Sequence, residues 1–204
     1  IMSETIADAD TKQTFDFTYD WDSAKGMLAF ELEALDGEGA FYGGAYCSRT
    51  AEQKIQDVTL AAGICTFRRE AYVKKNLQVL QNEIMDNKDS VLYGRLEVFV
   101  SDNGKTLDAA EFIHERVHLY PNRNVGGAGG FTRCLLEMKK SAAQTGVTHA
   151  LLMDDDVVIE PQALERTYML LALRRETYQD MFVGGAMLRL DEQAVQFEAG
   201  AVWH

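Results

Sequence analysis

Three consecutive aspartates, Asp154, Asp155 and Asp156, interrupt an otherwise apolar run of the sequence. Apolar residues flank them closely, at 150–153 and 157–159. A buried carboxylate without a partner is strongly destabilising, so three acids would not be tolerated inside a buried strand. They are tolerated if a strand ends just before them and they project from its carboxyl end. Ligands of open α/β sheets bind at that edge.

Carboxylates separated by one residue can share a hard divalent cation, which also accepts phosphate oxygens. We therefore predict that Asp154 and Asp156 bind Mn²⁺ or Mg²⁺. Adjacent carboxylates repel each other, and a bound cation offsets this repulsion and also neutralises charge that grows on a leaving diphosphate. The combination suits transfer from a nucleotide-activated donor. A solvated acidic turn on the surface is the structural alternative.

Polar clusters also follow two other predicted strands. Arg68 follows an apolar strand, and its planar donor fork could reach a phosphate or a base carbonyl. Asp102 could accept from a base N–H or a ribose hydroxyl. Taken alone, Arg68 could be an ordinary arginine at the start of a helix, and Asp102 could belong to an ordinary turn. The clusters are Thr66, Phe67, Arg68 and Arg69 after the strand at 58–65, and Ser101, Asp102, Asn103 and Gly104 after the strand at 96–100.

A glycine-rich run at 126–130 precedes a predicted helix that carries Phe131, Leu135 and Met138 on one face. Such a run lets the backbone approach a diphosphate and leaves helix N–H donors pointing at it. Its spacing does not fit the GxGxxG fingerprint, and no GK[ST] ending follows. Arg133, one turn into the helix, could add a phosphate contact, and surface charge is the alternative for this residue.

Strands and helices alternate in the order expected of an α/β fold. Strands are predicted at 58–65, 96–100, 117–120, 148–153 and 181–190, and helices around 73–84, at 106–115, after the glycine run and from Pro161. The alternation predicts a mostly parallel sheet flanked by helices. The carboxyl ends of its strands should bring the three polar clusters to one edge.

Residues 1–50 have a different pattern. Alternating or apolar segments predict strands at 14–20, 27–34 and 40–47, which indicate part of a β-sandwich domain. This domain would precede an α/β domain at 51–204. Trp21 or Tyr42 could stack on a sugar, and a structural accessory is the alternative.

Composition excludes several classes of protein. The net charge of -12 argues against a nucleic-acid binder, whose affinity depends on basic phosphate contacts. The three cysteines are scattered, show no zinc-binding spacing and are read as free thiols in a reducing compartment. No stretch has the length of a membrane span, and no signal peptide is evident.

The ordered set of clusters resembles that of family 2 glycosyltransferases with the GT-A fold, and most of all bacterial galactofuranosyltransferases. Members carry an N-terminal β-sandwich, a TFxR or TYxR strand end, an SDNG-like turn, NxGGxGG before a helix, and DDD. Here the glycine motif runs from Asn124 to Gly130. The resemblance implies an inverting, metal-dependent hexosyltransferase that moves galactofuranose from a UDP-sugar to a glycan or lipid-linked glycan acceptor in bacterial cell wall polysaccharide biosynthesis.

The resemblance also implies site residues. Asp154 and Asp156 would meet the metal, and Gly185, Glu198 and Trp203 would begin the acceptor site. The nucleotide-sugar would contact Thr66, Phe67, Arg68, Asp102, Asn103, Asn124, Gly126, Gly127, Gly129, Gly130, Arg133, Asp154 and Asp155. The implied location is cytoplasmic, with peripheral attachment to the inner face of the membrane left open.

The general base of an inverting reaction is a carboxylate that deprotonates the acceptor hydroxyl. In the family it lies well downstream of DDD, so we expect it beyond His204 and expect the domain to be truncated at its C-terminal side. Asp191 and Glu198 do not match its position. Two alternatives stay open, a nucleotidyltransferase that uses the same acids and a non-catalytic carbohydrate-binding module.

Overall fold

The computed structural model describes residue 5 and residues 11–18, 29–35, 39–47, 50–51 and 54–198. The chain divides into two compact units, Ile1–Cys47 and Ser48–His204. The predicted division at residue 50 lies close to this point. Trp21, which was predicted to stack on a sugar, and Trp203 of the predicted acceptor site lie outside the described residues.

The strands predicted in the first unit are not formed where the structure describes it. Residues 14–18, 29–34 and 40–47 have no strand assignment, and almost all of them are exposed. Phe17 is 56% exposed and Tyr42 is 70% exposed, so neither side chain belongs to a buried face. A few strands without a covered hydrophobic face are at best marginally stable. A glycan-binding role for this unit stays a prediction.

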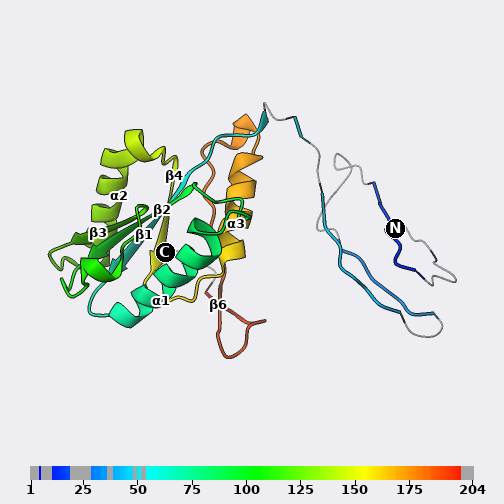
Figure 1. Ribbon diagram of the computed structural model, residues 1–204, viewed down its shortest axis with the longest axis horizontal. Helices are drawn as coiled ribbons and strands as arrows, with labels where there is room; N and C mark the ends of the chain where they lie inside the picture. The colour runs from blue at the N-terminus through cyan, green and yellow to red at the C-terminus, as the bar shows by residue number, and fades with distance from the viewer. Residues whose placement is uncertain are drawn as a thin grey trace, which may run out of the picture. The chain divides into compact units, whose positions relative to one another are not determined.

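The second unit contains the predicted α/β fold (Figure 1). Its main elements are β1 (Leu60–Thr66), α1 (Glu70–Leu80), β2 (Leu96–Asp102), β3 (Val117–Pro121), α2 (Gly126–Thr145), β4 (His149–Asp154) and α3 (Pro161–Ala172). A π-helical segment, η3 (Gln81–Met85), continues α1. The short elements after β2 and α3 are η4 (Ala109–Glu111), η5 (Glu176–Tyr178), β5 (Met187–Leu188) and β6 (Gln196–Glu198).

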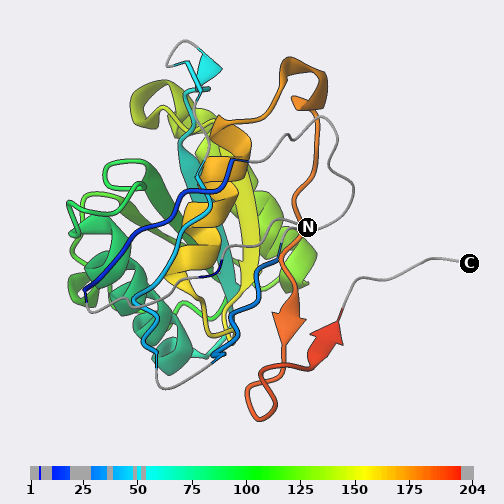
Figure 2. The same ribbon diagram turned by 90° about the vertical axis from the view of Figure 1, so that its right-hand side faces the viewer.

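The four long strands form one parallel sheet in the order β3-β2-β1-β4. The chain therefore moves outward from β1 to β3 and returns to the other side of β1. Residues of α1 and α3 pack in one core cluster with the sheet, whereas Cys134 and Met138 of α2 pack in a second cluster on the opposite face. When the chain crosses a parallel sheet first in one direction and then in the other, connections of the same handedness place their helices on opposite faces. Figure 2 shows α3 lying over the strands.

Helix α2 approaches β1 closely because glycines lie at the contact. A Cβ added at Gly63 would lie 3.0 Å from the Cε of Met138 and 3.1 Å from the Cβ of Cys134. A Cβ added at Gly130 would overlap the Sγ of Cys65. The first turn of α2 is therefore seated directly against the carboxyl end of β1.

Two predicted elements are shorter than expected. The helix predicted at 106–115 is reduced to η4, because the carboxylate of Asp102 binds the backbone N–H groups of Thr106 and Leu107 and holds them in a loop. The strand predicted at 181–190 is reduced to β5, which pairs antiparallel with β6 outside the main sheet. The adjacent Gly184 and Gly185 weaken a strand there.

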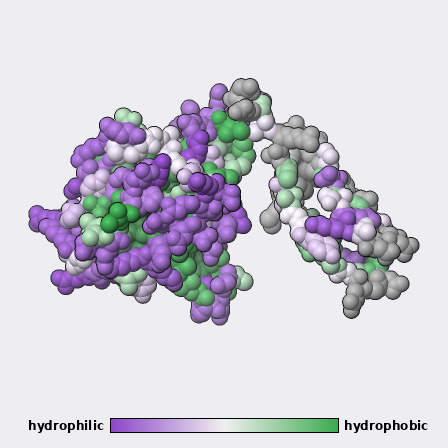
Figure 3. Space-filling model, in the orientation of Figure 1, coloured by the Kyte–Doolittle hydropathy of each residue, from purple (hydrophilic) through white to green (hydrophobic). Residues whose placement is uncertain are grey.

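The face of the second unit seen in Figure 3 is largely hydrophilic, with separate apolar patches. Among the described residues, no helix combines the length and the apolar character needed to cross a membrane.

Candidate nucleotide-sugar site

A cavity of about 270 Å³ opens at the carboxyl ends of the strands. It lies where the strand order reverses, between β1 and β4, which is where open α/β sheets bind ligands. All three predicted clusters and the glycine run contribute to it. Its lining residues are Cys65, Thr66, Phe67, Arg69, Asn103, Asn124, Gly126, Gly127 and Asp155.

The three aspartates point in different directions. Strand β4 ends at Asp154, and a turn follows. Asp155 is buried at 7% exposure, whereas Asp154 and Asp156 on either side of it are exposed. Among the described residues, Asp154 makes no side-chain hydrogen bond or ion pair, and Asp156 pairs with Arg69. The sequence placed the carboxylates together, and the structure separates one inward acid from two outward ones.

The inward acid is held by a buried hydrogen-bond network. The hydroxyl of Thr66 donates to Oδ2 of Asp155 at 2.6 Å, which is a short, charge-assisted bond. Asn76 of α1 donates its amide to the carbonyl oxygens of Asp155 at 3.0 Å and Val157 at 2.8 Å. Helix α1 thus holds the backbone of the acidic turn, and the end of β1 holds its buried side chain. Sequence reasoning missed Asn76, and its polar place on the apolar face of α1 was the available signal.

We expect Asn76→Ala to loosen the acidic turn. Asn76 is 4% exposed, so its loss leaves two carbonyls without their donor and should destabilise the protein by about 1–2 kcal/mol. Metal-dependent UDP affinity should fall about tenfold, as for other groups that orient ligand residues. Calorimetric titration measures this change. Asn87→Ala is the control, because Asn87 also donates to a carbonyl, that of Glu83, and lies outside the cavity lining. Equal UDP affinity for Asn76→Ala and wild type would contradict the expectation.

The cavity arginine is Arg69, whereas the sequence analysis assigned the contact to Arg68. Arg68 has a left-handed backbone with φ of 55°, and its guanidinium lies 5.2 Å from the centre of the Phe67 ring. Arg69 lines the cavity and pairs with Asp155 at 3.4 Å as well as with Asp156. The hydrogen bond to Asp156 raises the pKa of Arg69 further above its ordinary value. The fourth position of TFxR was the signal that pointed to Arg69.

Asp102 has a structural task that the sequence did not predict. Its side chain is 1% exposed, and its two oxygens accept from the backbone N–H groups of Gly104 at 2.9 Å, Thr106 at 2.7 Å and Leu107 at 2.9 Å. It is absent from the cavity lining, and its nucleotide contact stays a prediction. Asn103 does line the cavity, and its amide donates to the carbonyl of Gly126 at 3.2 Å.

The glycine run forms the first turn of α2. Gly126 has φ of 75°, and its N–H is bound by the side chain of Asn124 at 3.2 Å. Val125 at the N-cap position provides no side-chain cap. The start of the helix therefore presents N–H donors to the cavity that Gly126 and Gly127 line, and the positive end of the helix dipole favours an anion there.

The remaining predicted residues lie outside the cavity lining. Arg133 lies over the ring of Tyr120, at 5.2 Å from its centre, and pairs with Glu137 at 2.9 Å. Gly129 and Gly130 lie in the first turns of α2. Gly185 is exposed, and Glu198 ends β6. The acceptor roles stay predictions.

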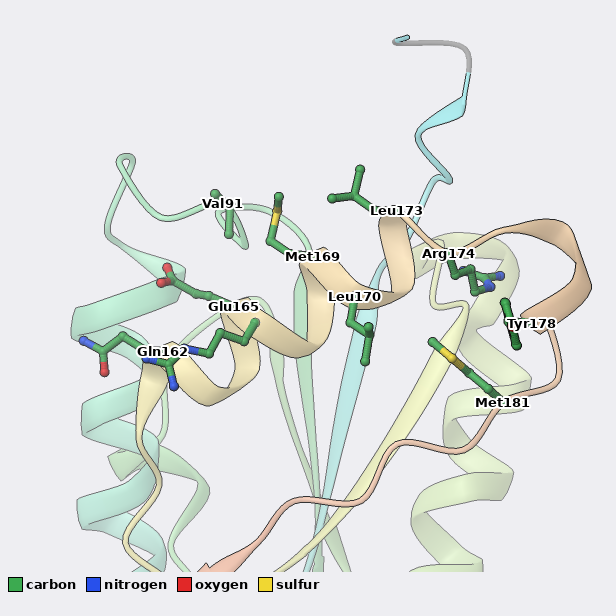
Figure 4. Close-up of a pocket in the computed structure, with 10 residues that line it drawn as sticks. Val91, Gln162, Glu165, Met169, Leu170, Leu173, Arg174, Tyr178 and Met181 are labelled. Carbon is green, nitrogen blue, oxygen red and sulfur yellow. The ribbon is translucent and has the colours of Figure 1, made fainter. Parts of the chain in front are cut away.

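A larger hollow of about 710 Å³ lies along α3 and is mainly apolar (Figure 4). Met169, Leu170 and Leu173 of α3 line it, together with Tyr178 and Met181 from the segment that follows. None of the predicted site residues contributes to it. Several of the predicted site residues are found instead at the smaller cavity at the strand ends.

Cys65 provides a reporter group inside the cavity. Burial and the negative charges of Asp155 and Asp154 raise its pKa. Burial raises the pKa of Cys134 to about 11, and this thiol is 0% exposed, whereas Cys47 is exposed.

With iodoacetamide at pH 8 we expect Cys47 to react first, Cys65 more slowly and Cys134 not at all, because the thiolate is the reactive form. UDP with Mn²⁺ should slow modification of Cys65 and leave that of Cys47 unchanged. Mass spectrometry of tryptic peptides measures the rates. Equal modification of Cys65 with and without nucleotide would place the nucleotide elsewhere.

The residues at the acidic turn fit a divalent cation. Mg²⁺ in proteins is often held by one or two carboxylates together with substrate phosphates and water. Asp154 and Asp156 are exposed acids at this turn, and the helix start that lines the cavity suits a phosphate. No group of three or more His, Cys, Asp or Glu side chains suited to a metal occurs within the part of the chain that the structure describes. A diphosphate and water would supply the other ligands.

Comparison with known proteins identifies the family of this chain. The sequence model of the family described as "Glycosyltransferase like family 2" matches residues 57–199. The chain belongs to glycosyltransferase family 2. This match confirms the predicted family, and the sheet flanked by helices confirms the predicted GT-A type of α/β fold in the second unit.

Two curated relatives of this glycosyltransferase chain carry the name galactofuranosyltransferase GlfT2. The protein from Mycolicibacterium smegmatis is 34% identical over 141 residues, covering 65% of this chain and 20% of the relative. The protein from Mycobacterium tuberculosis is 32% identical over 175 residues, covering 82% of this chain and 25% of the relative. The matched part of the chain thus spans a fifth to a quarter of the length of these relatives.

Proposed function

We propose that this glycosyltransferase chain binds a UDP-sugar with a divalent cation and serves an inverting transfer of galactofuranose to a glycan or lipid-linked glycan of the bacterial cell envelope. The names of the two relatives support the sugar. The observation that carries the donor class is the cavity in which Thr66, Asn103, Gly126 and Asp155 meet at the switch point of the sheet.

Each wall of the cavity suits a different part of the donor. The N–H groups at the start of α2, near Gly126 and Gly127, suit the diphosphate, because the N-cap residue Val125 caps none of them and the positive end of the helix dipole lies there. Arg69 offers a planar donor fork to the same anion. Asn103 and Asn124 add polar groups toward the nucleoside or the sugar.

The acidic turn suits the cation and the leaving group. Asp154 and Asp156 would hold the metal, which supplies positive charge to the diphosphate as it departs. Thr66 and Asn76 keep the turn in place through Asp155. The chain would thereby orient the donor, and Gly185, Glu198 and Trp203 remain the residues predicted to contact the acceptor.

Calorimetric titration of UDP into the protein, with Mn²⁺ and with EDTA, tests this proposal. We expect binding in Mn²⁺ and weak or no binding in EDTA, with ADP binding more weakly than UDP under both conditions. Equal binding in EDTA would mean that arginine and backbone donors hold the diphosphate without a metal. Tight binding of all nucleoside triphosphates without preference for uridine would favour a nucleotidyltransferase. Absence of UDP binding by a folded protein would contradict the proposal.

A further inference from the structure

We infer that Arg69 is an internal counter-ion that occupies the acidic turn until a donor diphosphate draws it away, so that metal binding and nucleotide binding promote each other. This inference concerns the regulation of the proposed donor site and rests on the proposed function. It assigns to Arg69 a second task besides contact with the donor.

Arg69 forms ion pairs with two of the three aspartates. Its Nη1 atom contacts carboxylate oxygens of Asp155 and Asp156 at the same time. Arg69 is the only side chain with which Asp156 forms an ion pair among the described residues. A cation shared by Asp154 and Asp156 must therefore compete with the guanidinium for the carboxylate of Asp156.

Arg69 also lies at the cavity where a diphosphate would bind. The residue lies between β1 and α1 and lines the cavity that the start of α2 also lines. Its side chain is 49% exposed, so no close packing holds the guanidinium against the aspartates. A diphosphate in the cavity offers oxygens that can bind two N–H groups of the guanidinium in parallel, whereas the two aspartates share its Nη1 atom alone. The donor can thus release Asp156 by giving Arg69 another partner.

This competition predicts a measurable thermodynamic coupling between the binding of Mn²⁺ and the binding of UDP. If UDP makes the acidic turn available to Mn²⁺, then Mn²⁺ must raise the affinity for UDP by the same factor. We expect this factor to be about tenfold, within the usual range for coupled sites. Without UDP, the wild-type protein should bind Mn²⁺ more weakly than a variant that lacks the guanidinium.

The experiment measures Mn²⁺ binding by electron paramagnetic resonance, which does not depend on catalysis, for the wild type, Arg69→Gln and Arg68→Gln. Arg68→Gln is the matched control. It removes the same charge at the neighbouring residue, and among the described residues the Arg68 side chain makes no ion pair with the aspartates. Without nucleotide, Arg69→Gln should bind Mn²⁺ about threefold more tightly than wild type, the size expected for loss of a partly exposed ion pair. Arg68→Gln should stay near wild type. UDP should raise the Mn²⁺ affinity of both proteins, because its diphosphate would also ligate the cation. The gain should be about tenfold for wild type and only about threefold for Arg69→Gln, whose acidic turn is already free of the guanidinium.

Three results would overturn the inference. Unchanged Mn²⁺ affinity in Arg69→Gln would show that the guanidinium does not compete with the cation. Equal gains in both arginine variants would reduce the effect to net charge. Unchanged coupling to UDP in Arg69→Gln would remove its link to the nucleotide. In each case UDP binding by the wild type would still support the proposed function, and its absence would contradict that function separately.

Discussion

Replacing Asp154 with asparagine should lower the affinity for UDP in the presence of Mn²⁺ by about 100-fold, because a metal ligand contributes several kcal/mol to the bound state. Asp154 is suited to this test because it is exposed and makes no side-chain hydrogen bond or ion pair among the described residues. Asparagine has nearly the same shape, so the free energy of unfolding should change by no more than about 0.5 kcal/mol. Calorimetric titration of UDP and a urea unfolding curve measure the two effects separately.

The control for Asp154→Asn is Glu83→Gln. Glu83 is also exposed and lies in η3, which follows α1 toward the opposite edge of the sheet. This change removes one negative charge without touching the acidic turn, and UDP affinity should stay at the wild-type value. If Asp154→Asn bound UDP and Mn²⁺ as tightly as the wild type, Asp154 would not be a metal ligand. Residual binding in EDTA should be the same for Asp154→Asn and the wild type.

Replacing Gly130 with valine should destabilise the second unit by about 3 kcal/mol, at the upper end of the usual cost of overpacking. An added Cβ overlaps the Sγ of Cys65, and it would also lie 3.0 Å from the Cβ of Cys65 and 3.3 Å from Nδ2 of Asn103. Helix α2 must therefore move away from β1, and the cavity wall moves with it. The midpoint of thermal unfolding should fall by about 6–12 °C, and UDP binding should weaken.

Gly127→Ala is the matched control for stability, since a Cβ at this neighbouring position of α2 meets no atom within 4 Å. It should stabilise the helix by about 0.5–1 kcal/mol, because alanine replaces a glycine in helical conformation. Adding Cys65→Ala to Gly130→Ala should recover part of the stability lost in Gly130→Ala alone. A wild-type unfolding temperature for Gly130→Val would show that the contact of α2 with β1 is looser than the structure indicates.

The sequence predicted the parts of the fold that depend on local pattern. The apolar strands at 58–65 and 96–100 are found as β1 and β2 with small shifts, and Pro161 is the first residue of α3. The prediction was wrong for the helix at 106–115, because the buried carboxylate of Asp102 binds the loop backbone. It was also wrong for the described parts of the strands at 14–20, 27–34 and 40–47, which form no strand and are almost entirely exposed.

The sequence by itself determined which residue types gather at the carboxyl edge of the sheet. Alternation of strands and helices makes the sheet parallel, and a parallel sheet places the ends of all its strands at one edge. The residues that follow β1, β2 and β4, and those that begin α2, therefore had to meet. The sequence also identified the acids and the glycine run as the groups suited to a cation and a diphosphate.

The tertiary structure decided which side chains face the cavity and which support it. Arg68 has a left-handed backbone conformation in the turn after β1, and Arg69, the next residue, lines the cavity. The turn after β4 buries Asp155 and exposes its two neighbours. Side-chain direction at a strand end depends on the dihedral angles of the turn and on partners far along the chain, such as Asn76 for the turn at Asp155. A local sequence pattern specifies neither the dihedral angles of the turn nor these distant partners. The direction of the side chains is therefore determined only when the helices and strands pack together.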